Sequence, residues 1–247
     1  MANWSDPRIG ASQPTTTIGR DVAYDAGLRS HMLSVYNYMA SAVLLTGIVA
    51  YFFASSGAVF SLFSLETGRL SGLGYLVMFA PLAIVLAFSF GLNRISTVTA
   101  QGLFWAYAVL LGMSLSAIFL VYTQSSIALT FFATAGAFAG LSLFGYTTKR
   151  DLSGMGTFLI MGLVGIIVAS IANLFMRSGP LDLAIAGIGV LIFAGLTAFH
   201  TQRIKSIYFE VAGTDQQGKM AIFGALQLYL DFINMFLFLL RFMGNRN

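Results

Sequence analysis

Long apolar runs separated by short polar breaks fill the chain from about residue 30 to its end. A transmembrane helix needs about 20 mostly apolar residues to cross roughly 30 Å of hydrocarbon. Apolar and polar residues do not alternate along these runs, so a β-barrel is not expected. The pattern predicts an all-α integral membrane protein with about seven transmembrane helices, near 32–54, 73–92, 101–122, 127–147, 155–176, 181–201 and 221–242.

The breaks are too short to hold a second domain, so we expect residues 31–247 to form one membrane domain. Residues 1–30 differ, because they are polar and contain Pro7, Pro14 and three consecutive threonines. They lack the apolar core of a signal peptide. We expect a polar tail that is flexible or lies on the surface, followed by a first membrane helix that acts as an uncleaved insertion signal.

Composition supports lipid as the surrounding solvent. The chain is 57% hydrophobic and 9% charged, whereas a soluble domain carries about 25% charged residues. The lack of cysteine excludes disulfides and thiolate metal sites. The net charge is +4, but the basic residues stand singly between apolar runs. This spacing is typical of orientation signals and does not indicate a nucleic-acid-binding surface.

The distribution of lysine and arginine predicts the orientation of the chain. If the N-terminus is inside, the inner side collects most of the 13 basic residues, namely Arg8, Arg20, Arg29, Arg94, Lys149, Arg150, Arg203, Lys205 and Lys219. The outer side receives Arg69 and Arg177, together with Arg241 and Arg246 if the last segment crosses fully. The positive-inside rule therefore predicts a cytoplasmic N-terminus.

Asp231 is the acidic residue that falls inside an apolar run, in LQLYLDFINMFLFLL. A carboxylate there costs about 2.5–3.5 kcal/mol, so it should face the bundle interior and have a partner. Gln227 and Asn234 lie four residues before it and three after it, on the same helical stripe. We interpret Asp231 as a protonation switch or cation ligand, with a structural hydrogen-bonding role as the alternative. The segment itself is either a full span or a re-entrant helix.

Other polar and small residues have simpler interpretations. His200 ends the sixth predicted span, where a histidine is often only a favourable contact with the helix dipole, and His31 is expected to be interfacial. Asn173, like the pair Asn37 and Ser41, is expected to form interhelical hydrogen bonds worth about 0.6 kcal/mol each. Lining the same path as Asp231 is the minor interpretation for Asn173.

Small residues in the fourth predicted span indicate close helix packing. Gly136 and Gly140 are four residues apart, with Ala133 and Ala137 beside them. This spacing lets two helix backbones approach each other. A glycine-lined path is the minor interpretation.

Three segments together resemble one known family: TTKRDLSGMGTFLIMGLVGIIVASIANLF, AFHTQRIK and LYLDFINMFLFLLRFMG. They are similar to the bacterial branch of the Bax inhibitor-1/YccA-like family, which also includes the eukaryotic transmembrane Bax-inhibitor-motif proteins. The resemblance runs from about residue 30 to the end. It implies seven helices with the last one central, a place in the cell (inner) membrane, and a pH-sensitive leak of calcium ions.

The resemblance also implies two aspartates, on the sixth and seventh helices, that share a proton and set the closed or open state. The second aspartate carries over to Asp231, but the family pattern YDTQ-x-IK reads FHTQRIK here, so His200 replaces the first. An arginine near the end of the second helix assists closure in some members. Arg94, in FGLNRIS, is the candidate for it, several residues further along. The gate is therefore expected to be Asp231 and His200, with the supporting polar residues Gln227, Asn234, Asn173 and Arg94.

A His–Asp pair predicts a pH response different from that of two carboxylates. Protonated His200 and ionised Asp231 stabilise each other, while burial opposes both charges. The pair should hold at moderate pH, weaken at high pH when His200 loses its proton, and weaken at low pH when Asp231 gains one. Calcium prefers several oxygen ligands, and histidine supplies none. We expect no cofactor beyond transiently bound calcium, with Asp231 as its ligand and weaker coordination than in a two-aspartate relative.

The same residues also bear on other functions, namely those of a protease, a transporter and a regulator. An aspartyl intramembrane protease needs two membrane aspartates, and a serine type needs a buried Ser–His pair; Ser114 is suitably placed, but both histidines lie at predicted span ends. We therefore expect no enzyme. An inverted-repeat transporter would show matching halves, which the sequence lacks. A non-conducting regulator that binds other membrane proteins, such as membrane proteases, is the alternative function, and the tail of residues 1–30 is its sequence support.

Overall fold

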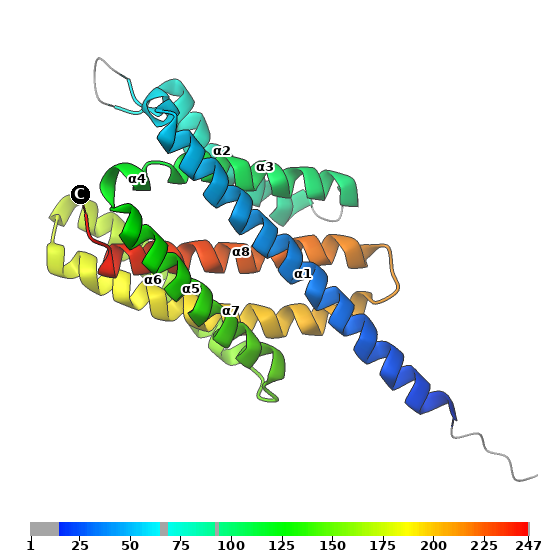
Figure 1. Cartoon of the computed structure of the whole chain (residues 1–247). Helices are drawn as coiled ribbons and strands as arrows, with labels where there is room; N and C mark the ends of the chain where they lie inside the picture. Colours follow the sequence, from blue (N-terminus) through cyan, green and yellow to red (C-terminus); the bar gives the residue numbers. More distant parts are fainter. Residues whose placement is uncertain (1–14, 65–68, 92–93, 247) are drawn as a thin grey trace, which may run out of the picture.

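The computed structural model describes residues 15–64, 69–91 and 94–246. Within these residues the structure is helical throughout (Figure 1), and the elements in order are α1 (Thr15–Ser55), η1 (Ala58–Leu62), α2 (Gly72–Gly91), α3 (Thr97–Leu115), α4 (Ile118–Val121), α5 (Gln124–Thr147), α6 (Ser153–Met176), α7 (Gly179–Val211) and α8 (Gln216–Met243). In the same described part, seven helices are long and apolar enough to cross a membrane. The predicted all-α membrane fold is confirmed.

Three helices differ in extent from the predicted spans. Helix α1 begins at Thr15, so the segment 15–30 that the sequence assigned to a polar tail is helical and continuous with the first span; residues 1–14 lie outside the described part. The third span is divided into α3 and α4 at Ser116, whose hydroxyl donates to the Met113 carbonyl at 2.6 Å. Helix α7 continues well past residue 201, to Val211.

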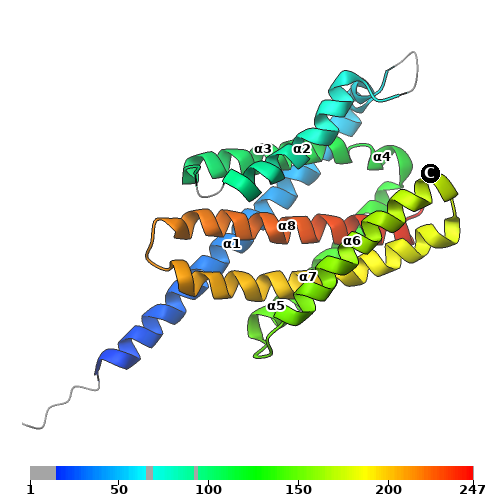
Figure 2. The ribbon, with the colours of Figure 1, turned by 180° about the vertical axis from the view of Figure 1, so that it is seen from behind.

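Helix α8 forms the centre of the bundle. Both views place it between α3 and α7 (Figure 1 and Figure 2), and it packs directly against α1, α3, α5 and α7. Of its most apolar stretch 61% is buried, compared with 11% for α6. Its 28 residues span about 42 Å at ~1.5 Å per residue. The last segment is thus long enough to cross the membrane fully and is central, as the family resemblance implied.

Hydrogen bonds at the buried end of a tyrosine hold α8 to two neighbouring helices. The Thr46 hydroxyl on α1 donates to the Ala108 carbonyl on α3 at 2.9 Å. Because that hydroxyl has one proton, it accepts at 2.7 Å from the hydroxyl of Tyr229 on α8. Tyr229 is fully buried. These polar groups are therefore paired across helices, as hydrocarbon requires.

The prediction that Gly136 and Gly140 pack against another helix of this chain is wrong. Both glycines are exposed, and a Cβ built on either would meet open space. Close packing occurs instead one and a half turns later, where Gly145 lies against the backbone of Ala198 and brings α5 onto α7. Spacing identifies a small-residue stripe, but the rotation of α5 decides which stripe faces inward.

Candidate functional site

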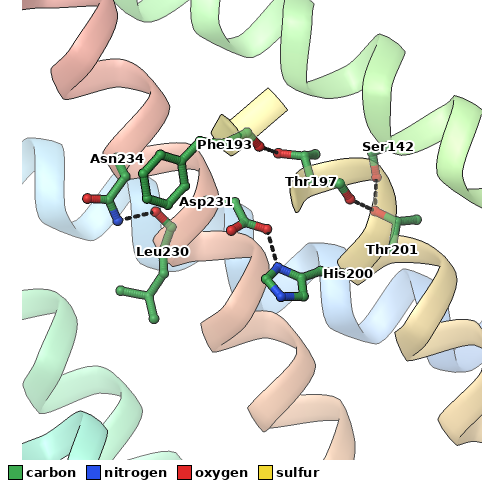
Figure 3. Close-up of polar contacts among 8 residues, drawn as sticks. All are labelled: Ser142, Phe193, Thr197, His200, Thr201, Leu230, Asp231 and Asn234. Carbon is green, nitrogen blue, oxygen red and sulfur yellow. Dashed lines mark hydrogen bonds and ion pairs between the residues drawn. The ribbon is translucent and has the colours of Figure 1, made fainter. Parts of the chain in front are cut away.

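A buried acid–histidine pair joins the two helices that share the most extensive contact. Asp231 lies near the middle of α8 with 2% of its surface exposed. His200 on α7 points at it, with 2.7 Å between its Nδ1 and Asp231 Oδ2 (Figure 3). Its Nδ1–H donates and the carboxylate accepts. The structure thus brings together the two residues expected to form the gate, and the acid has the partner that burial demands.

His200 does not end its helix, which corrects the sequence interpretation. Helix α7 continues for about three further turns, because Thr197, Thr201, Ile204 and Tyr208 recur at helical spacing and all four are buried. This apolar and threonine stripe keeps the polar-looking segment HTQRIKSIY in the bundle. His200 is therefore an intrahelical residue inside the protein, so a contact with the C-terminal dipole is not available to it.

The pair lies on the wall of a cavity of about 900 Å³ between α2 and α6, with α7 and α8 forming its floor. Gln227, Asp231, Asn234 and Arg241 line it from α8, so the predicted polar stripe faces one space. These α8 residues extend over about 21 Å of helix. The cavity otherwise has mainly apolar walls. A few convergent polar groups in an apolar cleft are the usual form of a small-ligand or ion site.

The two supporting polar groups on α8 behave differently. Asn234 Nδ2 donates to the Leu230 carbonyl one turn back at 2.8 Å (Figure 3), which leaves its amide oxygen as an acceptor. The buried Gln227 Oε1 finds no hydrogen-bond partner within the described part of the chain. A buried unpaired acceptor costs about 1–3 kcal/mol. The stripe therefore offers oxygen atoms to whatever enters the cavity.

A second ionic contact closes the opposite end of the cavity, and the sequence analysis missed it. Arg241 Nε donates to Asp182 Oδ2 at 3.0 Å, and its Nη2 bonds the other carboxylate oxygen. Asn173 Nδ2 donates to Asp182 at 3.4 Å, and Asn173 Oδ1 accepts from the Ser178 backbone at 3.0 Å. The positions of Asp182 and Arg241 in the sequence could have indicated this contact, because antiparallel helices place the start of α7 beside the end of α8.

Two of the supporting residues lie away from the cavity. Asn173 forms the expected interhelical hydrogen bond, from α6 to Asp182 on α7, and does not line the cavity. Arg94 is exposed in the connection between α2 and α3 and is not among the residues that line the cavity. Only 3% of His31 is exposed, and its ring lies 5.2 Å from that of Tyr208.

The side chain of Gln202 links two of the segments that resemble the family. Gln202, in FHTQRIK, accepts from the Leu152 backbone at 2.9 Å and donates to the Arg150 carbonyl at 2.8 Å. Both partners belong to TKRDLS, the turn before α6. Asp151 in that turn accepts from the Ser153 backbone at 2.9 Å, and these hydrogen bonds from Ser153 lower the pKa of the exposed Asp151 carboxyl. The segment after His200 thus anchors α7 to the α5–α6 turn.

The arrangement can change its charge and can receive a cation, but its ligand set is sparse. Calcium takes six to eight oxygen ligands. Among residues 15–64, 69–91 and 94–246, no three His, Cys, Asp or Glu side chains gather as a metal site. A cation in the cavity would meet one carboxylate and two amides, but also the imidazole of His200 and the guanidinium of Arg241.

Comparison with known proteins agrees with the fold and the motifs. A family model described as "Inhibitor of apoptosis-promoting Bax1" matches residues 28–247. The chain is 49% identical to RP147 of Rickettsia prowazekii over 96% of this chain and 99% of that protein. It is 47% identical to the inner membrane protein YbhL of Escherichia coli, over 90% and 94%. A Caulobacter vibrioides protein is 49% identical over 91% and 92%. The chain therefore belongs to the Bax inhibitor-1 family.

Proposed function

We propose that the protein is a pH-sensitive leak channel for calcium and related cations, with the His200–Asp231 pair as its gate. The observation that carries this proposal is the position of the pair: a 2.7 Å contact on the wall of a cavity that follows α8, between a buried acid and a histidine whose side chain is 16% exposed. Intramembrane acids are costly and mark ion or proton paths by default. The bond joins α7 to α8, so its loss removes a polar link between these helices beside the cavity. The proposed activity is not enzymatic.

The expected pH dependence follows from the charges. The ion pair exists only while His200 is protonated and Asp231 is ionised. Raising the pH removes the histidine charge, and lowering it removes the carboxylate charge, so flux should be lowest at an intermediate pH. Asp151 does not account for the acid-side change, because its hydrogen bonds keep its pKa below the ordinary value.

We propose a cytoplasmic N-terminus and a place in the inner membrane. Basic residues near the end of α7 and the start of α8 lie at one end of the bundle: Lys205 Nζ donates to the Tyr146 carbonyl at 3.1 Å, and Lys219 Nζ to the Ile95 carbonyl at 3.4 Å. Positive residues favour the cytoplasmic side. The relative from Escherichia coli is named an inner membrane protein, which supports the same location here.

The test is calcium flux into dye-loaded liposomes across a pH series. The native protein should show a minimum at intermediate pH, and Asp231→Asn should leak at every pH because no ion pair can form. His200→Asp should give a leak that rises with pH, because two close carboxylates share a proton only in acid. An unchanged flux and pH profile for His200→Asp would refute the gate. Gln101→Glu, away from the cavity on α3, is a charge-changing control.

A non-conducting regulator that binds other membrane proteins is the second candidate. One face of α1 supports it: Asn37 and Ser41 are exposed along a groove that also contains Ser34, Tyr38 and Trp105. Polar side chains on the outside of a transmembrane helix gain hydrogen bonds from a partner helix. Asn37→Leu should weaken partner capture and leave flux unchanged if this function operates, whereas Asp231→Asn should change flux alone.

A further inference from the structure

A second large cavity lies on the face of α8 that points away from Asp231. It has a volume of about 780 Å³ and lies between α1 and α5, which make little direct contact with each other. Phe232 of α8 closes its floor and contacts the rings of Phe131 and Phe138, each with centroids 5.6 Å away. In Figure 1 α1 and α5 run along one face of the molecule with α8 behind them. We call this space the α1/α5 crevice.

The crevice opens sideways at the depth of the hydrocarbon. Leu33, Leu44 and Leu143 form its lip and are 51%, 64% and 63% exposed. Its walls below the lip are Met39, Val43 and alanines of α5. Water gains few hydrogen bonds in such a space, and a dry void would forfeit packing contacts. A flexible hydrocarbon chain is therefore the material that fits it.

One end of the crevice has a different chemistry. Arg29 is exposed at its mouth, and Tyr36, Ser142 and Tyr146 line the adjoining wall. None of the described lining residues is acidic, and Arg29 supplies a positive charge. A guanidinium with tyrosine and serine hydroxyls, at the end of an apolar groove, complements a phosphate on a lipid.

We infer that the α1/α5 crevice binds one anionic phospholipid from the leaflet on the side of the N-terminus. Its phosphate lies at Arg29, and one acyl chain follows the crevice to Phe232. A free phosphate would gain nothing from the apolar part, and a neutral lipid would gain less from the guanidinium. The inference concerns a site that the proposed ion path does not use.

The bound lipid would contact side chains that are hydrogen-bonded to the residue next to the gate histidine. The Tyr36 hydroxyl donates to Ser142 at 2.6 Å, Ser142 donates to Thr201 at 3.0 Å, and Thr201 donates to the Thr197 carbonyl at 2.8 Å. Figure 3 shows the α5–α7 part of this chain of hydrogen bonds beside His200. The crevice wall is thus connected to the helix turn that carries the gate histidine.

Native mass spectrometry of the full chain in detergent tests the site, with palmitoyl-oleoyl phosphatidylglycerol and phosphatidylcholine as probes. The wild-type protein should retain one phosphatidylglycerol and bind it about fivefold more tightly than phosphatidylcholine, equivalent to about 1 kcal/mol for a basic residue at an anionic surface. Arg29→Gln should reduce this preference to near parity, and Arg29→Lys should keep it. Arg203→Gln, an exposed charge outside the crevice, should have no effect.

Variants that fill the crevice provide a second test of the lipid site, independent of the charge variants. Ala139→Phe should lower retention of both lipids about tenfold or more, whereas Ala137→Phe, on an exposed part of α5 outside the crevice, should not. Ala139→Leu is used in place of Ala139→Phe if size exclusion shows that the phenylalanine variant aggregates. Equal binding of the two lipids by the wild-type protein, or undiminished retention in both crevice-filling variants, would overturn the inference. Neither result bears on the flux experiment, so the two proposals fail separately.

Discussion

The two cavities beside α8 have similar size and opposite chemistry. One, between α2 and α6, measures about 900 Å³ and contains the pair His200–Asp231. The other, between α1 and α5, measures about 780 Å³ and has Phe232 as its floor. Successive residues of an α-helix point about 100° apart, so Asp231 and Phe232 line different cavities. A single-residue step on α8 separates the proposed ion path from the proposed lipid-binding groove.

The largest expected effect comes from unpairing the acid in the polar cavity. His200→Leu should lower the free energy of unfolding by about 3–5 kcal/mol, because it leaves a buried carboxylate without its charge partner. The double variant His200→Leu/Asp231→Leu should recover most of that loss. Thermal and denaturant unfolding in detergent measures both. A single variant as stable as the wild-type protein would mean that the pair is not structurally coupled.

The apolar crevice should respond through packing and not through charge. Phe232→Leu removes two edge-to-face ring contacts, each worth about 0.5–1.5 kcal/mol beyond burial. We expect a loss of about 1–3 kcal/mol in unfolding free energy with the pH profile of flux unchanged. The same stability and flux measurements apply. A shifted pH profile in this variant would show that the two cavities are not separate in function.

Thiol labelling compares the wetness of the two cavities directly, because the native chain has no cysteine. The thiolate is the reactive form, and an apolar environment suppresses it. A charged maleimide should label Asn234→Cys about tenfold faster than Ala135→Cys, which lies in the α1/α5 crevice. Equal rates would contradict the assignment of water to one cavity and lipid to the other.

The smallest effect is expected at the hydrogen bonds between the lipid crevice and α7. Tyr36→Phe removes the donor to Ser142, and interhelical hydrogen bonds in membranes average about 0.6 kcal/mol. Stability should fall by about that amount, and phosphatidylglycerol should still bind. A stability loss above about 2 kcal/mol would assign Tyr36 a larger role.

The sequence predicted the spans well because apolar length is a local property of the chain. It predicted the polar stripe of α8 because helical spacing is fixed. It could not place the end of α7, since HTQRIKSIY looks like a loop until Ile204 and Tyr208 are seen to be buried. It also misplaced Gly136 and missed the contact of Asp182 with Arg241. Both depend on how helices rotate and meet, which no single helix encodes.

The most direct test of the gate is to exchange its two members. In His200→Asp/Asp231→His the acid and the imidazole trade helices but can still meet across the same 2.7 Å contact. The account predicts that this double variant restores low calcium flux at intermediate pH, while Asp231→His alone leaks at that pH. A double variant that leaks as much as Asp231→His alone, although folded by size exclusion, would contradict the claim that the pair itself closes the path.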